Sequence, residues 1–417
     1  MSLKVAISRT VTMGVVALVS GVAQLLLARI LGPEEYGFFI FSVSLVTLAM
    51  TSSALFGTPA VAIRLFAGLN NEIYKRNLCE WILKTSLKAS ILSSIILVIV
   101  ALMTYRAYGV STFIAALILL VSARNFCNDG LLTASGRTDV AARRTMIAPA
   151  CALALAFGLM SANLIPDTGV ALMCAWAGGQ IIASILSSRA VRKTLSALRV
   201  EDTTSEKNLL KNWRKQGIAV LVSSILISLM VIDVVLVGVI TKSPELAGTY
   251  GMAVRITAIS SIGVQSTFLA YAPSLTKEAI EVGQEWKKKL NRSRMFAASA
   301  VGICLIGTYF WYPAVSSAFA PEYESAYWPT VILMIGILIE AISGPVGMIL
   351  QARKRENQVI GLNVCVFVVF LITASILINS YGIIGAACSV SLTILIRNVV
   401  LLTMLHKTQS ERCPKQT

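Results

Sequence analysis

The chain has 417 residues, of which 56% are hydrophobic and only 13% are charged, and its mean hydropathy is +0.77. Soluble proteins carry about 25% charged residues, so this composition excludes an ordinary soluble protein and predicts an integral membrane protein. The net charge of +16 comes mostly from Lys and Arg between the apolar stretches, which indicates membrane orientation and not nucleic-acid binding.

The first two apolar stretches, 11–31 and 37–57, each have about the 20 residues that cross a bilayer. Between them lies the turn Leu31-Gly-Pro-Glu-Glu-Tyr-Gly37. Gly32 can end the first helix in a left-handed conformation, and Pro33 suits the first position of the next helix. The two glutamates that follow lie near the positive end of that helix. The sequence therefore predicts a helical hairpin.

The segment Gly57-Thr-Pro59 is expected to break the second helix, since it combines glycine with proline. Four further spans complete the first half, at 86–106, 112–133, 145–165 and 169–188. The loop from Arg189 to Lys215 then carries eight Lys and Arg residues. We interpret 189–216 as a basic cytoplasmic linker that separates the halves 1–188 and 217–417.

The second half repeats this plan, with spans at 217–240, 248–271, 295–315, 328–350, 358–379 and 383–405. Its turn Ser243-Pro-Glu-Leu-Ala-Gly-Thr-Tyr250 is similar to the first turn, which indicates a duplication. The predicted fold is an all-α integral membrane protein with about 12 transmembrane helices in two six-helix bundles. The basic loops place both termini in the cytoplasm.

Charged residues inside a span are costly and are candidates for function. Away from the membrane ends, where a residue such as Arg29 could snorkel into the headgroups, those in this chain are Arg124, Asp129, Asp233, Arg255, Glu340 and Arg397. Arg124 and Arg397 occupy comparable depths, one in each half, and neither has an evident carboxylate partner on a neighbouring helix. Arginine binds phosphate through a planar pair of donors and keeps its charge. We therefore predict that Arg124, Arg255 and Arg397 bind an anionic substrate.

Asp233 and Glu340 are candidates for binding a coupling ion. Glu340 lies beside Gly344-Pro345, where the helix is expected to open, and a carboxylate in a low-dielectric site gains proton affinity. Two alternatives remain. Asp233 and Arg255 lie at similar depths on consecutive helices and could form a structural ion pair, and Glu340 could be a hydrogen-bonded packing residue.

The sequence contains no catalytic signature. The one histidine, His406, lies in the basic C-terminal segment, and the eight cysteines are scattered singly, which favours neither a metal site nor a disulfide framework. No glycine-rich phosphate loop or nucleophile motif is present. We predict no cofactor and no enzymatic activity. A membrane enzyme of polysaccharide assembly is the alternative from a different class.

Three segments carry a resemblance to a known family: Leu31–Gly37, Tyr250-Gly-Met-Ala-Val-Arg255, and Ala320–Tyr327. They resemble polysaccharide (O-antigen type) flippases of the multidrug/oligosaccharidyl-lipid/polysaccharide exporter superfamily. The resemblance implies alternating access around a central cavity and transport of an oligosaccharide linked to polyprenyl pyrophosphate across a bacterial inner membrane. It also implies membrane lipids, a polymerase and a chain-length regulator as partners. A multidrug or lipid-precursor exporter of that superfamily is the alternative.

Overall fold

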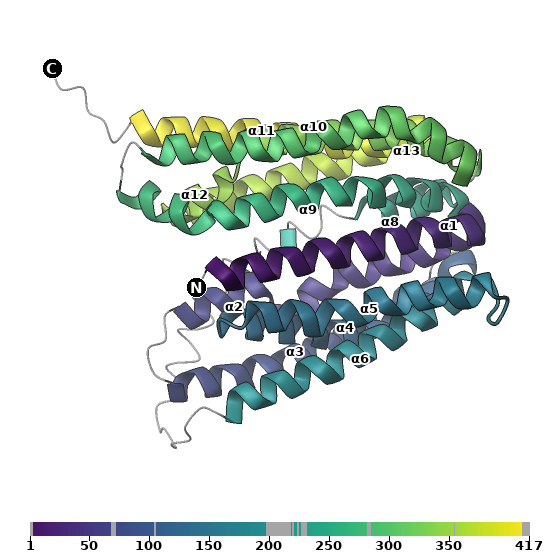
Figure 1. Ribbon diagram of the computed structural model, residues 1–417, viewed down its shortest axis with the longest axis horizontal. Helices are drawn as coiled ribbons and strands as arrows, with labels where there is room; N and C mark the ends of the chain where they lie inside the picture. Colours follow the sequence, from purple (N-terminus) through teal and green to yellow (C-terminus); the bar gives the residue numbers. More distant parts are fainter. Residues whose placement is uncertain are drawn as a thin grey trace. The chain divides into compact units, whose positions relative to one another are not determined.

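The structure is a computed structural model that describes residues 3–67, 72–103, 106–196, 218, 221–222, 225–226, 232–281, 285–319, 321–353 and 355–410. These residues form helices joined by short turns, and no strand occurs among them (Figure 1). The chain divides into two compact units. Unit 1 comprises 1–238 with 242–248, and unit 2 comprises 239–241 with 249–417. This division does not test the predicted halves, whose boundary stays a prediction.

Unit 1 is built mainly from the helices that precede the basic loop. Its elements are α1 (Leu3–Ala54), η1 (Leu55–Gly57), α2 (Pro59–Ala67), α3 (Glu72–Met103), α4 (Arg106–Ala134), α5 (Thr138–Ser161), α6 (Gly169–Ser196) and most of α8 (Asp233–Thr241). α1 consists of two helices joined at Gly32, where φ is 72°. The positive φ agrees with the predicted glycine end of the first helix, whereas the ψ of 169° is extended and not left-handed helical. α4 is central, because it packs against α1, α2, α3, α5 and α6.

The turn after the first helix is attached to the start of α6. The Gly169 amide, at the N-terminus of α6, donates a hydrogen bond of 2.7 Å to a carboxylate oxygen of Glu35. The first amides of a helix lack partners within the helix and carry partial positive charge. Glu35 therefore caps a helix far along the chain, in addition to any effect on its own helix.

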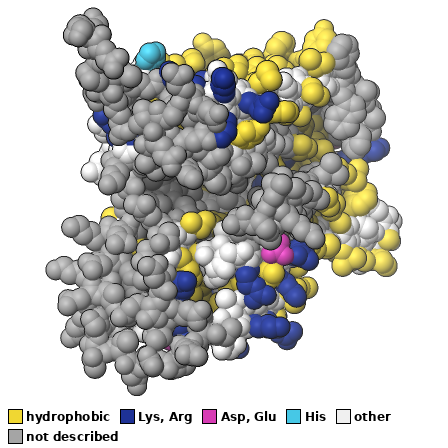
Figure 2. Space-filling view, turned by 60° about the vertical axis from the view of Figure 1, so that its left-hand side comes forward, with side chains coloured by type: hydrophobic (Ala, Val, Ile, Leu, Met, Phe, Trp, Pro, Cys, Tyr) yellow, Lys and Arg dark blue, Asp and Glu magenta, His cyan; other side chains and the backbone are white. Residues whose placement is uncertain are grey.

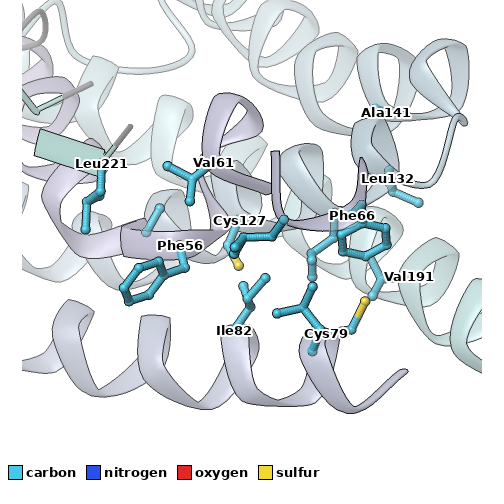
Figure 3. Packing of buried hydrophobic residues seen from close by; sticks show 14 residues of the cluster. Phe56, Val61, Phe66, Cys79, Ile82, Cys127, Leu132, Ala141, Val191 and Leu221 are labelled. Carbon is cyan, nitrogen blue, oxygen red and sulfur yellow. The ribbon is translucent and has the colours of Figure 1, made fainter. Parts of the chain in front are cut away.

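The predicted break at Gly57 is confirmed. The α-helix gives way to the short helix η1, Thr58 is extended with φ −60° and ψ 143°, and α2 begins at Pro59. Figure 3 shows the hydrophobic cluster around this break, in which Phe56, Ile82 and Cys127 come from η1, α3 and α4. The break is therefore surrounded by tightly packed apolar side chains.

Unit 2 contains most of α9 and the helices that follow it. Its elements are α9 (Pro244–Glu281), α10 (Glu285–Phe319), η2 (Pro321–Ala326), α11 (Tyr327–Ser343), α12 (Val346–Ala352) and α13 (Glu356–Ser410). α13 consists of two helices joined at Gly382, where φ is 57°. α11 packs between α10 and α13, and α12 packs on α13.

Within the described ranges, seven helical stretches are long and apolar enough to cross a membrane. Two of them, Val19–Ile63 and Asn357–Lys407, contain the kinks at Gly32 and Gly382, and each is longer than the roughly 40 residues that two crossings need. The chain is a multi-pass membrane protein. Twelve spans in two six-helix bundles remain a prediction, and most of the predicted span 217–240 lies outside the described residues.

The described surface is strongly apolar. Figure 2 shows hydrophobic side chains over much of it, with Lys and Arg side chains gathered in patches. Exposed apolar side chains include Leu92 and Ile95 on α3 and Ile303 and Ile306 on α10. Such extensive exposed apolar surface is abnormal for a soluble protein and is the surface that lipid would cover.

Candidate substrate-binding and ion-coupling residues

Arg124 projects from the central helix of unit 1. Its side chain is half-buried, and within the described part of the chain it makes no hydrogen bond or ion pair. A guanidinium group keeps its charge and has five donors, so this helix presents a fixed positive charge whose donors are available to an anion.

A polar network that the sequence analysis did not predict lies beside Arg124. The Asn125 side chain donates to the Thr145 carbonyl at 3.0 Å and to the Gln180 side chain at 3.1 Å. The Asn128 side chain donates to the hydroxyls of Ser187 and Ser188, each at 2.9 Å. These bonds join α4 to α5 and α6. The sequence signal was a pair of asparagines three residues apart within a predicted span.

Arg397 lies on α13 and interacts with Glu340 on α11. The two opposite charges are near enough to influence each other, although they form no ion pair within the described ranges, and Arg397 Nε donates to Asn363 Oδ1 at 3.3 Å. Asn363 is completely buried. The sequence analysis found no evident carboxylate partner for Arg397 on a neighbouring helix, and the packing of α11 on α13 brings the Glu340 carboxylate into its surroundings without an ion pair among the described residues. Two predicted site residues with different roles therefore share one electrostatic environment.

Asp233 and Arg255 belong to different units. Asp233 begins α8, is 5% exposed, and accepts a hydrogen bond of 3.0 Å from the Val234 amide. Arg255 lies on α9 in unit 2 and is half-buried. The predicted ion pair between them, and a common cavity for Arg124, Arg255 and Arg397, stay predictions.

Arg294 is a further charged residue, which the sequence analysis did not identify as a candidate. It lies on α10, and its guanidinium group donates to the Ser343 carbonyl at the end of α11, with Nε at 2.9 Å and the terminal nitrogen Nη2 at 2.7 Å. Within the described ranges, no three His, Cys, Asp or Glu side chains lie close enough together to hold a metal ion.

Neither a known protein family nor a curated protein matches this sequence, whereas solved structures do match its fold. An inward-facing multidrug resistance MATE transporter of the MOP superfamily superposes with a TM-score of 0.71 at 14% identity, over 99% of this chain and 100% of that chain. The lipid II flippase MurJ, in an inward closed conformation, superposes with a TM-score of 0.67 at 13% identity, over 96% of this chain and 87% of that one. The chain has the fold of these transporters. The MATE multidrug transporter DinF-BH is also similar, with a TM-score of 0.58 at 17% identity, over 97% of this chain and 94% of that one.

Proposed function

We propose that this protein is a transporter that moves an oligosaccharide repeat unit linked to polyprenyl pyrophosphate from the inner to the outer leaflet of a bacterial inner membrane. The observation that carries the proposal is the half-buried Arg124 on a central helix of a transporter fold, with no hydrogen bond to another described residue. A charge at such a position is costly unless a ligand or a cavity uses it.

The three arginines have the same task in this proposal. Arg124, Arg255 and Arg397 neutralise the pyrophosphate while it passes through the region where the bilayer solvates it least. Each charge-assisted hydrogen bond to phosphate contributes on the order of 1.5–3 kcal/mol. Alternating access then moves the headgroup across, as transporters built from repeats do. A polymerase and a chain-length regulator remain predicted partners.

The coupling ion is assigned to Asp233 and Glu340. Because Glu340 interacts with Arg397, a proton or cation on Glu340 removes the negative charge that competes with phosphate for this arginine. Substrate capture and ion binding are thereby linked at one place in unit 2. The linkage is reciprocal, so phosphate on Arg397 also changes the affinity of Glu340 for its ion.

A multidrug exporter is the alternative, and the likeness to the multidrug transporter DinF-BH favours it. A lipid-precursor exporter is compatible with the likeness to the lipid II flippase. Arginines in the spans favour an anionic substrate over a cationic drug, because like charges repel. The solved structures named above are transporters, which disfavours the membrane-enzyme alternative.

The test is complementation of a strain that lacks the gene. Arg124→Ala and Arg397→Ala, expressed at the parental level in the membrane, should weaken substrate capture by roughly ten to a hundred fold and should reduce glycan export. The corresponding lysine variants should recover part of the glycan export, because lysine keeps the charge but loses the planar donor pair. Arg192→Ala, at an exposed position on α6, is the matched control. Full complementation by both alanine variants would contradict the proposal.

A further inference from the structure

The helix pair α11 and α12 is one predicted span broken near its end. The Gly344 amide donates to the Glu340 carbonyl at 3.0 Å and closes the last turn of α11. Gly344 itself has φ +78° and ψ −177°, a conformation that side chains of L-residues disfavour. Helix geometry resumes at Val346. The break is therefore encoded by Gly344, and it lies one turn after Glu340.

Arg294 fills the break from the neighbouring helix. Its two hydrogen bonds to the Ser343 carbonyl, at 2.9 Å and 2.7 Å, satisfy an acceptor that the interrupted helix leaves without an amide partner. Its stem lies against Gly344, because a Cβ there would be 3.0 Å from Cγ and Nε of Arg294. One side chain thus binds the end of α11 and covers the glycine that ends it.

The break also separates two hydrophobic clusters. On one side, α12 packs through Val346 and Ile349 against Leu290 of α10 and residues of α13. On the other side, α11 packs through Ile337 and Ala341 against a second cluster, formed with Ala297 and Val301 of α10 and with Val264 and Phe268 of α9. Arg294 lies between Leu290 and Ala297 in sequence. It therefore joins two packed regions at the point where the helix between them is interrupted.

We propose that Arg294 is a positioning residue: by holding the Ser343 carbonyl, it latches the last turn of α11 to α10 and fixes the position of Glu340, one turn before the break, relative to the charge of Arg397. The proposal rests on the proposed function only in regarding Glu340 and Arg397 as the place where ion and substrate binding are linked. When the latch opens, the two packed regions can move as separate bodies about Gly344, as broken helices allow in transporters.

Hydrogen–deuterium exchange of the full chain in lipid nanodiscs tests the latch without any substrate. Arg294→Gln should increase exchange by about tenfold or more in peptides that cover 340–352, because opening would no longer break a charge-assisted hydrogen bond. Arg294→Lys should give a smaller increase. Arg292→Gln, at an exposed position two residues away, should match the parent. Unchanged exchange in Arg294→Gln, or an equal increase throughout unit 2, would overturn the latch.

A double-mutant cycle tests positioning. Glu340→Gln and Arg397→Gln, alone and combined, give the coupling between the two charges as a factor in the unfolding equilibrium constant. In the Arg294→Gln background we expect this coupling factor to fall by about threefold or more, which corresponds to one weakened charge contact. In the Arg292→Gln background it should persist. If Arg294 only stabilised the fold, Arg294→Gln would lower the free energy of unfolding of every variant equally. The coupling factor would then stay unchanged, and this result would overturn the positioning role. Glycan export separately tests the proposed function.

Discussion

Gly37 and Gly248 pack reciprocally, each against the backbone of the turn that contains the other. A Cβ on Gly37 would lie 1.9 Å from the Pro244 carbonyl oxygen, and a Cβ on Gly248 would lie 2.0 Å from the Pro33 carbonyl oxygen. All four residues belong to unit 1. The two similar turns found in the sequence are therefore in contact, and neither glycine has room for a side chain.

Gly37→Ala and Gly248→Ala should each lower stability by about 1–3 kcal/mol, since overpacking against backbone cannot be relieved by a rotamer change. The loss should occur although alanine is the better helix former. Thermal unfolding in detergent measures the effect. Gly263→Ala on α9, where no described atom beyond the neighbouring turns of its own helix lies within 4 Å of the added Cβ, is the control and should be neutral or slightly stabilising. Equal melting temperatures for all three variants would contradict the close packing.

The asparagine network should contribute to the association of α4 with α6. Asn128→Leu removes two hydrogen bonds between these helices. Such bonds in membrane proteins average about 0.6 kcal/mol each, so we expect a loss of about 1 kcal/mol. Ser196→Ala on α6, whose hydroxyl, among the residues that the structure describes, bonds only to the Lys193 carbonyl of its own helix, should have little effect. If Asn128→Leu unfolds at the parental temperature, the network has no role in stability.

Membrane orientation is predicted from the distribution of Lys and Arg. A phosphatase fused after Pro166 or Glu322 should be active in the periplasm, because both residues lie in loops between spans that are nearly free of positive charge. A fusion at Lys207, in the basic loop, should be inactive. An active fusion at Lys207 together with inactive fusions at the other two positions would show that the orientation is the reverse of the predicted one.

Local features of the fold could be predicted from the sequence. Apolar length located the helices, and Gly32, Gly57 and Gly344 marked interruptions because glycine and proline act on their own backbone. The influence of the Glu340 charge on Arg397 could not be predicted. Glu340 lies on another helix, and only the packing of α11 on α13 brings the two charges together.

Arg294 was not singled out for a related reason. Its sequence neighbours Lys287, Lys288 and Arg292 make it part of a basic segment. The role proposed for Arg294 depends on the backbone carbonyl of Ser343. The amino-acid sequence does not show which carbonyl lacks an amide partner within its helix. The asparagines of α4 could not be singled out by charge, because they are neutral. Neutral polar groups are nevertheless also costly to bury without partners.

The hydrogen bond between Glu35 and Gly169 has a consequence for how the chain is made. Domains generally begin to fold during synthesis, from the N-terminus onward. The Glu35 carboxylate is made early, but the amide that it binds in the finished protein belongs to a helix that is translated much later. Until the ribosome has passed Gly169, the first hairpin lacks this contact, and its polar turn must be held by water or lipid headgroups. This contact between the first turn and α6 can therefore form only after Gly169 has been translated.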